Sequence, residues 1–261
     1  MIKFDLHCHT KAGSIDARIS IERYIEILKS RGFSGMLVTD HDTYKGYRYY
    51  DRNCRASTEN FTVLAGVEYD TKDAGHILVI MPDGIFLPVL KIRGMSLARL
   101  THLVHQYGGI LGPAHPFGTR YNSALLLRKI RKNPHLVAHF DFIEGFNTCE
   151  SPEANLKAQA LAKSYHKPCV GGSDSHKEDY VGMAFTAFQQ QITCNNDLIA
   201  AITGGGIISF GGTERTMLPK HKKRHSLAAS FGFRAYNRSL GVLYSPYRQL
   251  KLRKLPLHRK R

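Results

Sequence analysis

Histidines and carboxylates that can bind metal ions occur at several separated points of the sequence. The chain has 14 histidines in 261 residues, roughly twice the number that typical usage would give. Nine candidates adjoin short apolar runs: His7, His9, Asp40, His41, Asp42, Glu68, His115, Asp174 and His176. With His76 they supply six imidazoles and at least two carboxylates, more than one tetrahedral zinc ion takes. The set therefore predicts a multinuclear site for divalent Zn, Mn or Fe.

Each of these nine residues lies just past the end of a run expected to form a buried strand. The expected strands are residues 2–6, 35–38, 62–67, 77–81, 110–112, 140–146, 169–172 and 207–210. In a parallel sheet or barrel the carboxyl ends of the strands meet on one face, where sites are built. Alternation along an extended chain turns His7 and His9 to the same side, and likewise Asp174 and His176. One His-x-His pair is weak evidence, but the coincidence across five segments favours metal binding.

Helical patterns alternate with these strands. Ser20, Ser96 and Ser151 are expected N-caps, and Gly32 and Gly108 stand where the first two helices end. Strand and helix alternation over about 210 residues predicts a parallel α/β architecture, either a closed barrel or an open sheet.

Six short motifs follow one another within residues 1–213. They are DLHCHT at 5–10, TDHD at 39–42, GVEYDT at 66–71, GHIL at 75–78, PAHPF at 113–117 and GGSDSH at 171–176. In this order they resemble the motifs of the PHP (polymerase and histidinol phosphatase) domain superfamily. The resemblance implies an α/β fold, a distorted (β/α)7 TIM-like barrel, with three divalent metal ions at its C-terminal mouth. It also implies hydrolysis of phosphoesters.

The resemblance further implies a ligand set. One metal ion would take His7, His9, Glu68 and Asp174, and Glu68 would bridge to a second ion held by His76 and His115. A third ion would take His41, His176 and a residue of the loop after His9, in which Asp16 is the only carboxylate. Asp40 and Asp42 are expected to orient His41 or its loop without binding metal.

Such a centre predicts attack on phosphorus by metal-activated hydroxide. We expect His41, His176 and Asp174 to be catalytic, with His41 or His176 a candidate proton donor to the leaving group unless bound water serves instead. Arg120 and Asn147 are expected to bind substrate, because both follow strands that end at the mouth.

Charge divides the chain into two parts. Residues 215–261 hold 14 of the 37 basic residues and no acidic residue, whereas the preceding part is nearly balanced. We therefore expect a metal-dependent hydrolase domain over 1–213 and a basic C-terminal extension over 214–261. Basic clusters interleaved with aromatic residues suit nucleic acid, although an anionic membrane or simple docking on the barrel would also explain them.

Several functions remain open from sequence. The first is a phosphoesterase acting on a phosphorylated small molecule or nucleotide. The alternatives are a 5′-to-3′ exonuclease or end-processing enzyme on short RNA or DNA, a non-catalytic nucleic-acid-binding module, and hydrolysis of a C–N bond. No run of apolar residues is long enough for a transmembrane segment, and the five scattered cysteines indicate reduced thiols, so a cytoplasmic location is expected.

Overall fold

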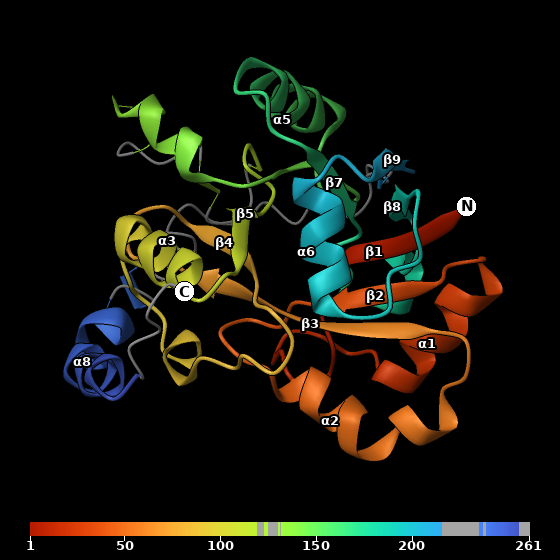
Figure 1. Ribbon diagram of the computed structural model, residues 1–261, viewed down its shortest axis with the longest axis horizontal. Coiled ribbons are helices and arrows are strands. Elements are labelled where there is room, and N and C mark those ends of the chain that lie inside the picture. Colours follow the sequence, from red (N-terminus) through yellow and green to blue (C-terminus); the bar gives the residue numbers. More distant parts are fainter. Residues whose placement is uncertain (119–122, 125–129, 131, 216–234, 237–238, 256–261) are drawn as a thin grey trace.

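The strands form one mixed sheet and one small pair. The computed structural model describes residues 1–118, 123, 124, 130, 132–215, 235, 236 and 239–255. The larger sheet has the order β5-β4-β3-β2-β1-β8-β9 (Figure 1). Its strands are β1 (Ile2–Cys8), β2 (Gly35–Val38), β3 (Thr62–Asp70), β4 (His76–Ile80), β5 (Ile110–Pro113), β8 (Ala184–Phe188) and β9 (Ile207–Gly212). Two further strands, β6 (Ile143–Asn147) and β7 (Cys169–Gly172), pair in parallel.

The large sheet curls into a half-barrel, and the β6–β7 pair lies across its open side. The amide of Asp174, just after β7, donates to the carbonyl of His7 in β1 over 2.9 Å. The amide of Asp141, just before β6, donates to the carbonyl of Leu111 in β5 over 2.8 Å. These bonds join both ends of the small pair to the sheet and give the distorted barrel expected from the sequence.

Apolar side chains from most of the strands fill the interior. The inward cluster comprises Phe4, Leu6, Leu37, Leu64, Leu78, Ile80, Ile110, Phe142 and Val170, with Leu198 and Ile202 of helix α6 (Asn195–Thr203) packed against them. A second cluster joins the other face of β2 and β3 to helix α1 (Ile21–Ser30). Burial on both faces explains why β2 is apolar throughout, with no polar alternation.

Serine caps and glycine ends fix the helices as the sequence predicted. The hydroxyl oxygens of Ser20, Ser96 and Ser151 accept hydrogen bonds from the third residue of α1, α3 (Leu97–Gln106) and α5 (Pro152–Ser164). Gly32 and Gly108 have φ of 72° and 74°, left-handed values that glycine adopts without strain. Helix α2 (Lys45–Asn53) was not expected from the sequence.

Strand direction departs from the parallel pattern. Strands β4 and β8 run antiparallel to their neighbours, whereas β1, β2 and β3 are parallel. Strand β8 was not anticipated, because its sequence AFTAF lacks the Val and Ile enrichment of the other runs. The α/β class and the PHP-type fold are confirmed, while the all-parallel arrangement was wrong.

Part of the basic extension packs against the barrel. Helix α8 (Ser245–Arg253) buries Arg248, whose guanidinium donates to the backbone carbonyls of Arg93 and Gly241. Leu252 and Leu255 pack against the core cluster that includes α3.

The domain boundary between residues 213 and 214 stays a prediction. Among the helices of the described residues, none is both long and apolar enough to cross a membrane.

Candidate metal centre

A buried carboxylate, Glu68 of β3, lies at the middle of the histidine cluster. Its Oε1 is 2.9 Å from Nδ1 of His76 and 3.0 Å from Nε2 of His115. Its Oε2 is 2.9 Å from Nδ1 of His41, 3.2 Å from Nε2 of His9 and 3.5 Å from Nε2 of His7. Five imidazoles from four strand ends thus surround one side chain.

A bulge in β1 directs His7 and His9 toward this carboxylate. The register between β1 and β2 shifts between Asp5 and Cys8, and Cys8 packs in the outer cluster against α1, whereas Phe4 packs inside. Bulges near sites commonly re-aim side chains in this way. The two Nε2 atoms of His7 and His9 lie 3.1 Å apart, and both lie within 3.5 Å of Oδ1 of Asp174.

His76 reaches the same mouth because β4 runs antiparallel. Asp70, the last residue of β3, pairs with His76, the first residue of β4. The beginning of β4 therefore lies where the parallel strands end, which explains how a residue that precedes its strand joins residues that follow theirs.

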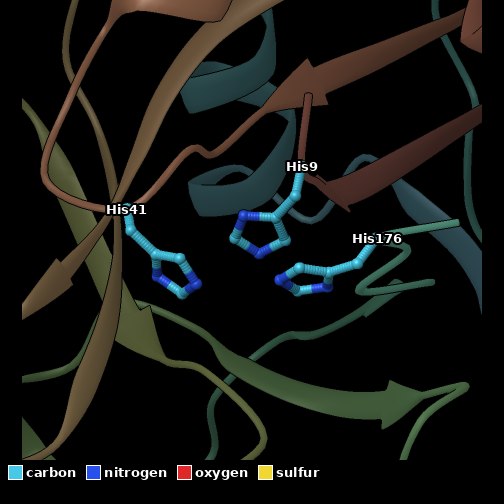
Figure 2. A group of neighbouring side chains, drawn as sticks. All are labelled: His9, His41 and His176. Atoms are coloured by element: carbon cyan, nitrogen blue, oxygen red, sulfur yellow. The ribbon is translucent and has the colours of Figure 1, made fainter. Parts of the chain in front are cut away.

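The outer side of the cluster is formed by His41, His176 and Asp16. Oδ2 of Asp16 lies 3.3 Å from Nε2 of His176 and 3.6 Å from Nε2 of His41. Figure 2 shows the rings of His9, His41 and His176 converging from three separate segments of the chain. The side chains of His41 and His176 are 24% and 23% exposed, and that of Asp16 is 54% exposed. This side faces solvent.

The inner imidazoles are held through their second nitrogens by buried polar groups. Nδ1 of His7 donates to Oε1 of Glu144 over 2.8 Å. Nδ1 of His9 lies 3.1 Å from the hydroxyl of Ser14, and Nδ1 of His115 lies 3.2 Å from that of Ser123. Each contact leaves the Nε2 atom directed at the carboxylates, the arrangement usual for imidazole ligands of metals.

Backbone strain accompanies the site. His115 and Asp174 have φ of 31° and 52°, and Asp42 has φ of 49°. Positive φ is costly for residues other than glycine and concentrates at functional sites. In this chain two of the strained residues belong to the candidate ligand set.

The charges in the cluster stabilise one another against burial. Burial raises the pKa of Glu68, but His76, His41 and His7 together hold it well below its usual value. Burial lowers the pKa of His41, and Glu68 and Asp16 more than compensate, raising it well above normal. Burial also lowers the pKa of His9, and His176 and His41 lower it further. Lower proton affinity favours metal over proton at His9.

The residues fit a metal centre. Oε2 of Glu68 is buried and makes no hydrogen bond, although three imidazole nitrogens lie within 3.5 Å of it. An unsatisfied buried carboxylate oxygen is costly unless a cation neutralises it. Three groups of side chains each place their ligand atoms within 4.8 Å of one another: His7, His9 and Glu68; His41, Glu68 and His76; and His9, His41 and His176.

The structure brings the whole expected ligand set to this mouth: His7, His9, Asp16, His41, Glu68, His76, His115, Asp174 and His176. The two expected substrate-binding residues differ. Asn147 is buried, and its amide donates to Glu144 Oε2 and Asp174 Oδ2 while accepting from the amide of Cys149. These contacts favour a positioning role for Asn147. Arg120 lies outside the described residues.

Asp40 and Asp42, on either side of His41, support different parts of the site. Asp40 accepts from Thr10 and from the hydroxyl of Ser14, which in turn contacts His9, so it supports His9 more directly than His41. Asp42 forms an ion pair with Arg93 over 3.0 Å and accepts from the amide of Asp70. Asp42 therefore anchors the loop that carries His41, which was one of the two roles expected for it.

Sequence reasoning missed Glu144, Ser14 and Ser123. Glu144 lies inside strand β6 and not after it, so it does not fit the pattern of polar residues at strand ends. Its signal was a lone carboxylate within an otherwise apolar run. The two serines have no distinguishing pattern in the sequence.

Comparison with known proteins identifies relatives of this chain. The profile of the PHP-associated family PHP_C matches residues 152–206. An uncharacterized protein of Methanocaldococcus jannaschii is 28% identical over 108 residues, which are 41% of this chain and 46% of that protein. The match thus spans about half the length of this curated relative.

Solved structures resemble most of the chain. PsfC of Pseudomonas syringae PB-5123 has a TM-score of 0.62 at 16% identity, covering 95% of this chain and 98% of its own. A complex of endonuclease Q with a 27-mer duplex substrate carrying an abasic lesion scores 0.62 at 17% identity, covering 82% and 60%. A metal-dependent phosphoesterase, so described provisionally, of Bifidobacterium adolescentis scores 0.54 at 16% identity, covering 78% and 96%. The chain therefore has the fold of the PHP-family metal-dependent phosphoesterases.

Proposed function

We propose that the protein is a multinuclear metal-dependent phosphoesterase that hydrolyses a phosphate ester of a nucleotide or small metabolite. The observation that carries the proposal is the buried Glu68 carboxylate, surrounded by five imidazoles and left with one oxygen lacking a hydrogen bond. The likeness to the phosphoesterase fold supports the same reaction class.

The residues that would hold three divalent ions, of Zn, Mn or Fe, are those of the expected ligand set gathered at the mouth. His7, His9 and Asp174 would share one ion with Glu68, His76 and His115 a second, and His41, His176 and Asp16 a third. Bound divalent ions lower the pKa of water and neutralise charge on a phosphoryl group. The nitrogen and oxygen ligands present suit borderline divalent ions.

The remaining polar groups keep these ligands in place. Glu144 fixes the ring of His7, Ser14 that of His9 and Ser123 that of His115. Asn147 bridges Glu144 to Asp174 and so couples two walls of the site. Ligands held before substrate arrives need no rearrangement during the reaction.

Substrate would enter on the side of His41 and His176, where the cluster is open to solvent. These two imidazoles have access to a leaving group, and their raised pKa values, caused by the carboxylates that overcome burial, favour the protonated form when no metal is bound. Either could pass a proton to a departing alkoxide only while it is not a metal ligand, because a neutral imidazole bound to metal is a poor proton donor. Asp174 would act by holding its Oδ1 toward His7 and His9.

A second candidate is end-processing of nucleic acid. Endonuclease Q, which shares the fold, was solved with a DNA duplex. In this chain Arg253, the last residue of α8, and Lys254 after it are exposed, and the Lys251 ammonium lies 5.2 Å from the ring centroid of the half-exposed Tyr247. Paired cations and aromatic rings suit a single strand. A strand-processing role predicts that removing residues 235–261 impairs hydrolysis of oligonucleotides but spares small phosphate esters.

The test measures metal content and then phosphate release. Purified protein is loaded with Mn²⁺ or Zn²⁺ and assayed with nucleoside monophosphates, sugar phosphates and 5′-phosphorylated oligonucleotides. We expect metal-dependent release from at least one class and its loss in His9→Ala. His139→Ala, which removes an exposed histidine far from the cluster, is the matched control. Full metal loading with no release from any substrate would contradict the proposal.

A further inference from the structure

Arg215, the first basic residue of the extension, lies beside the mouth and not with the rest of the tail. It directly follows the chain segment after β9, and its amide donates to the carbonyl of Thr148 over 2.9 Å. Thr148 comes immediately after β6, and its own amide donates to the carbonyl of Gly172 at the end of β7. The backbone of Arg215 is therefore fixed at the ends of the two strands that carry Glu144 and lead to Asp174.

The side chain of Arg215 lies one layer outside the candidate ligands. Its guanidinium lies close enough to the thiol of Cys149 to oppose the rise in the pKa of that thiol that burial causes, and the sulfur of Cys149 lies 3.5 Å from the carbonyl oxygen of Asp174. Its guanidinium carbon also stacks 4.5 Å from the ring centroid of Tyr180, in the turn that follows the motif containing Asp174 and His176. Two loops of the mouth therefore hold this cation between them.

Arg215 forms no ion pair with a carboxylate among the described residues, although Glu150 and Asp174 act on the same Cys149 thiol. Its side chain is only partly exposed. Arg93 and Arg23 differ: Arg93 is paired with Asp42 and Asp70, and Arg23 with Glu26 and Glu178. A partly buried guanidinium without a counterion is suited to bind an anion.

We infer that Arg215 binds a second anionic group of the substrate, beyond the phosphoryl group that reacts. The inference rests on the proposed function and narrows its substrate to molecules with two phosphates. Stacking on Tyr180 occupies the face of the guanidinium and leaves N–H groups along its edge to donate to two phosphate oxygens. The second group is either a terminal phosphate or the next phosphodiester of a strand.

A matched pair of substrates tests this role. A nucleoside 5′-monophosphate and the corresponding 3′,5′-bisphosphate differ only by the second phosphate, and a 5′-phosphorylated dinucleotide presents its second phosphate as a diester with one negative charge in place of about two. For Arg215→Gln we expect kcat/KM to fall about 10- to 100-fold on the substrates with two phosphates and less than about twofold on the monophosphate, since charge-assisted bonds of this kind are worth roughly 1.5–3 kcal/mol. Arg215→Lys, which keeps the charge but not the planar fork, recovers part of the loss.

Arg55→Gln is the control, because Arg55 also lies over a tyrosine, Tyr50, but on the remote α2 side of the molecule. The bisphosphate and the dinucleotide separate the two sources of the second phosphate. A fall of equal size on the monophosphate and on the substrates with two phosphates would overturn the inference and leave the phosphoesterase proposal intact. If the wild type releases no phosphate at all, the proposed function fails, and equilibrium titration of the same ligands then tests the role of Arg215. Equal affinity of wild type and Arg215→Gln for the bisphosphate would overturn the inference as well. A tenfold weaker affinity of Arg215→Gln would support it.

Discussion

The inner and outer walls of the candidate metal centre are built in different ways. On the inner wall His7, His9 and His115 are buried, and each ring is held by a buried partner that is not itself a candidate ligand. On the outer wall His41 and His176 are partly exposed and share Asp16, which is more than half exposed. The inner wall is therefore preorganised by buried hydrogen-bond partners, whereas the outer wall depends on an exposed carboxylate of the loop after His9.

This difference indicates that the inner wall serves mainly to hold metal ions and the outer wall to contact substrate. Fixed ligands suit ions that stay bound, because little ordering remains to be done when metal arrives. A wall open to solvent suits exchange of ligands and contact with substrate. Glu68 belongs to both walls, since one of its oxygens contacts His76 and His115 and the other contacts His41.

Removing the charge shared by both walls should have the largest effect. In Glu68→Gln we expect both inner and outer metal sites to weaken, with kcat/KM falling on the order of 10³-fold or more. Metal content by mass spectrometry and initial rates measure this. Glu59→Gln, at an exposed position, is the control. Wild-type metal content in Glu68→Gln would show that the carboxylate is not shared.

A change confined to the inner wall should be smaller. Glu144→Gln removes the charge that orients His7 without removing a ligand, and substitutions of this type typically cost about 10- to 100-fold in metal affinity. Competition with a fluorescent chelator measures the affinity. If Glu144→Gln binds metal as tightly as the wild type, the inner wall is not organised by this residue.

On the outer wall, Asp16→Asn should weaken one ion and leave the inner ions bound. We expect an activity loss of roughly tenfold that added metal partly restores, because the carboxylate is exposed and its ion exchanges with solvent. Asp51→Asn, on α2 and paired with Arg55, is the control. Loss of all metal from Asp16→Asn would remove the distinction between the two walls.

The smallest effect concerns pH and the metal-free protein. Burial lowers the pKa of His115, but Glu68, Asp174 and Glu144 raise it to about 9, above its unfolded value of 6.5. This charge stabilises the metal-free fold fully below about pH 6.5, and the stabilisation is lost as pH rises through 9. Urea unfolding with chelator should show a decrease on the order of 1–3 kcal/mol between pH 6.5 and 9.5. Metal-loaded protein should not show it, and a metal-free stability that is flat or rises over this range would contradict the assignment.

The sequence could indicate which side chains meet at the mouth, because polar residues at the ends of apolar runs are visible without a structure; their role as metal ligands stays a prediction. His7, Glu68, His115 and Asp174 all follow this rule. His76 does not follow this rule, because it precedes its strand and reaches the mouth only when β4 runs antiparallel. Strand direction is set by connections and packing that residue patterns do not encode.

Other parts of the site depend on tertiary contacts that single-sequence patterns conceal. Glu144 is hidden within a strand, and Ser14 and Ser123 become partners of histidines only through folding. Composition assigned Arg215 to the basic tail, whereas hydrogen bonding at the ends of β6 and β7 places it beside Cys149 and Tyr180.

The most direct test of the account is a crystal structure of the Mn²⁺-loaded or Zn²⁺-loaded protein with anomalous scattering recorded at the metal edge. We predict more than one anomalous peak in coordination contact with Glu68, with further contacts to His7, His9 and His76. Peaks confined to other residues, or a single ion that does not touch Glu68, would contradict the proposal of a shared multinuclear centre.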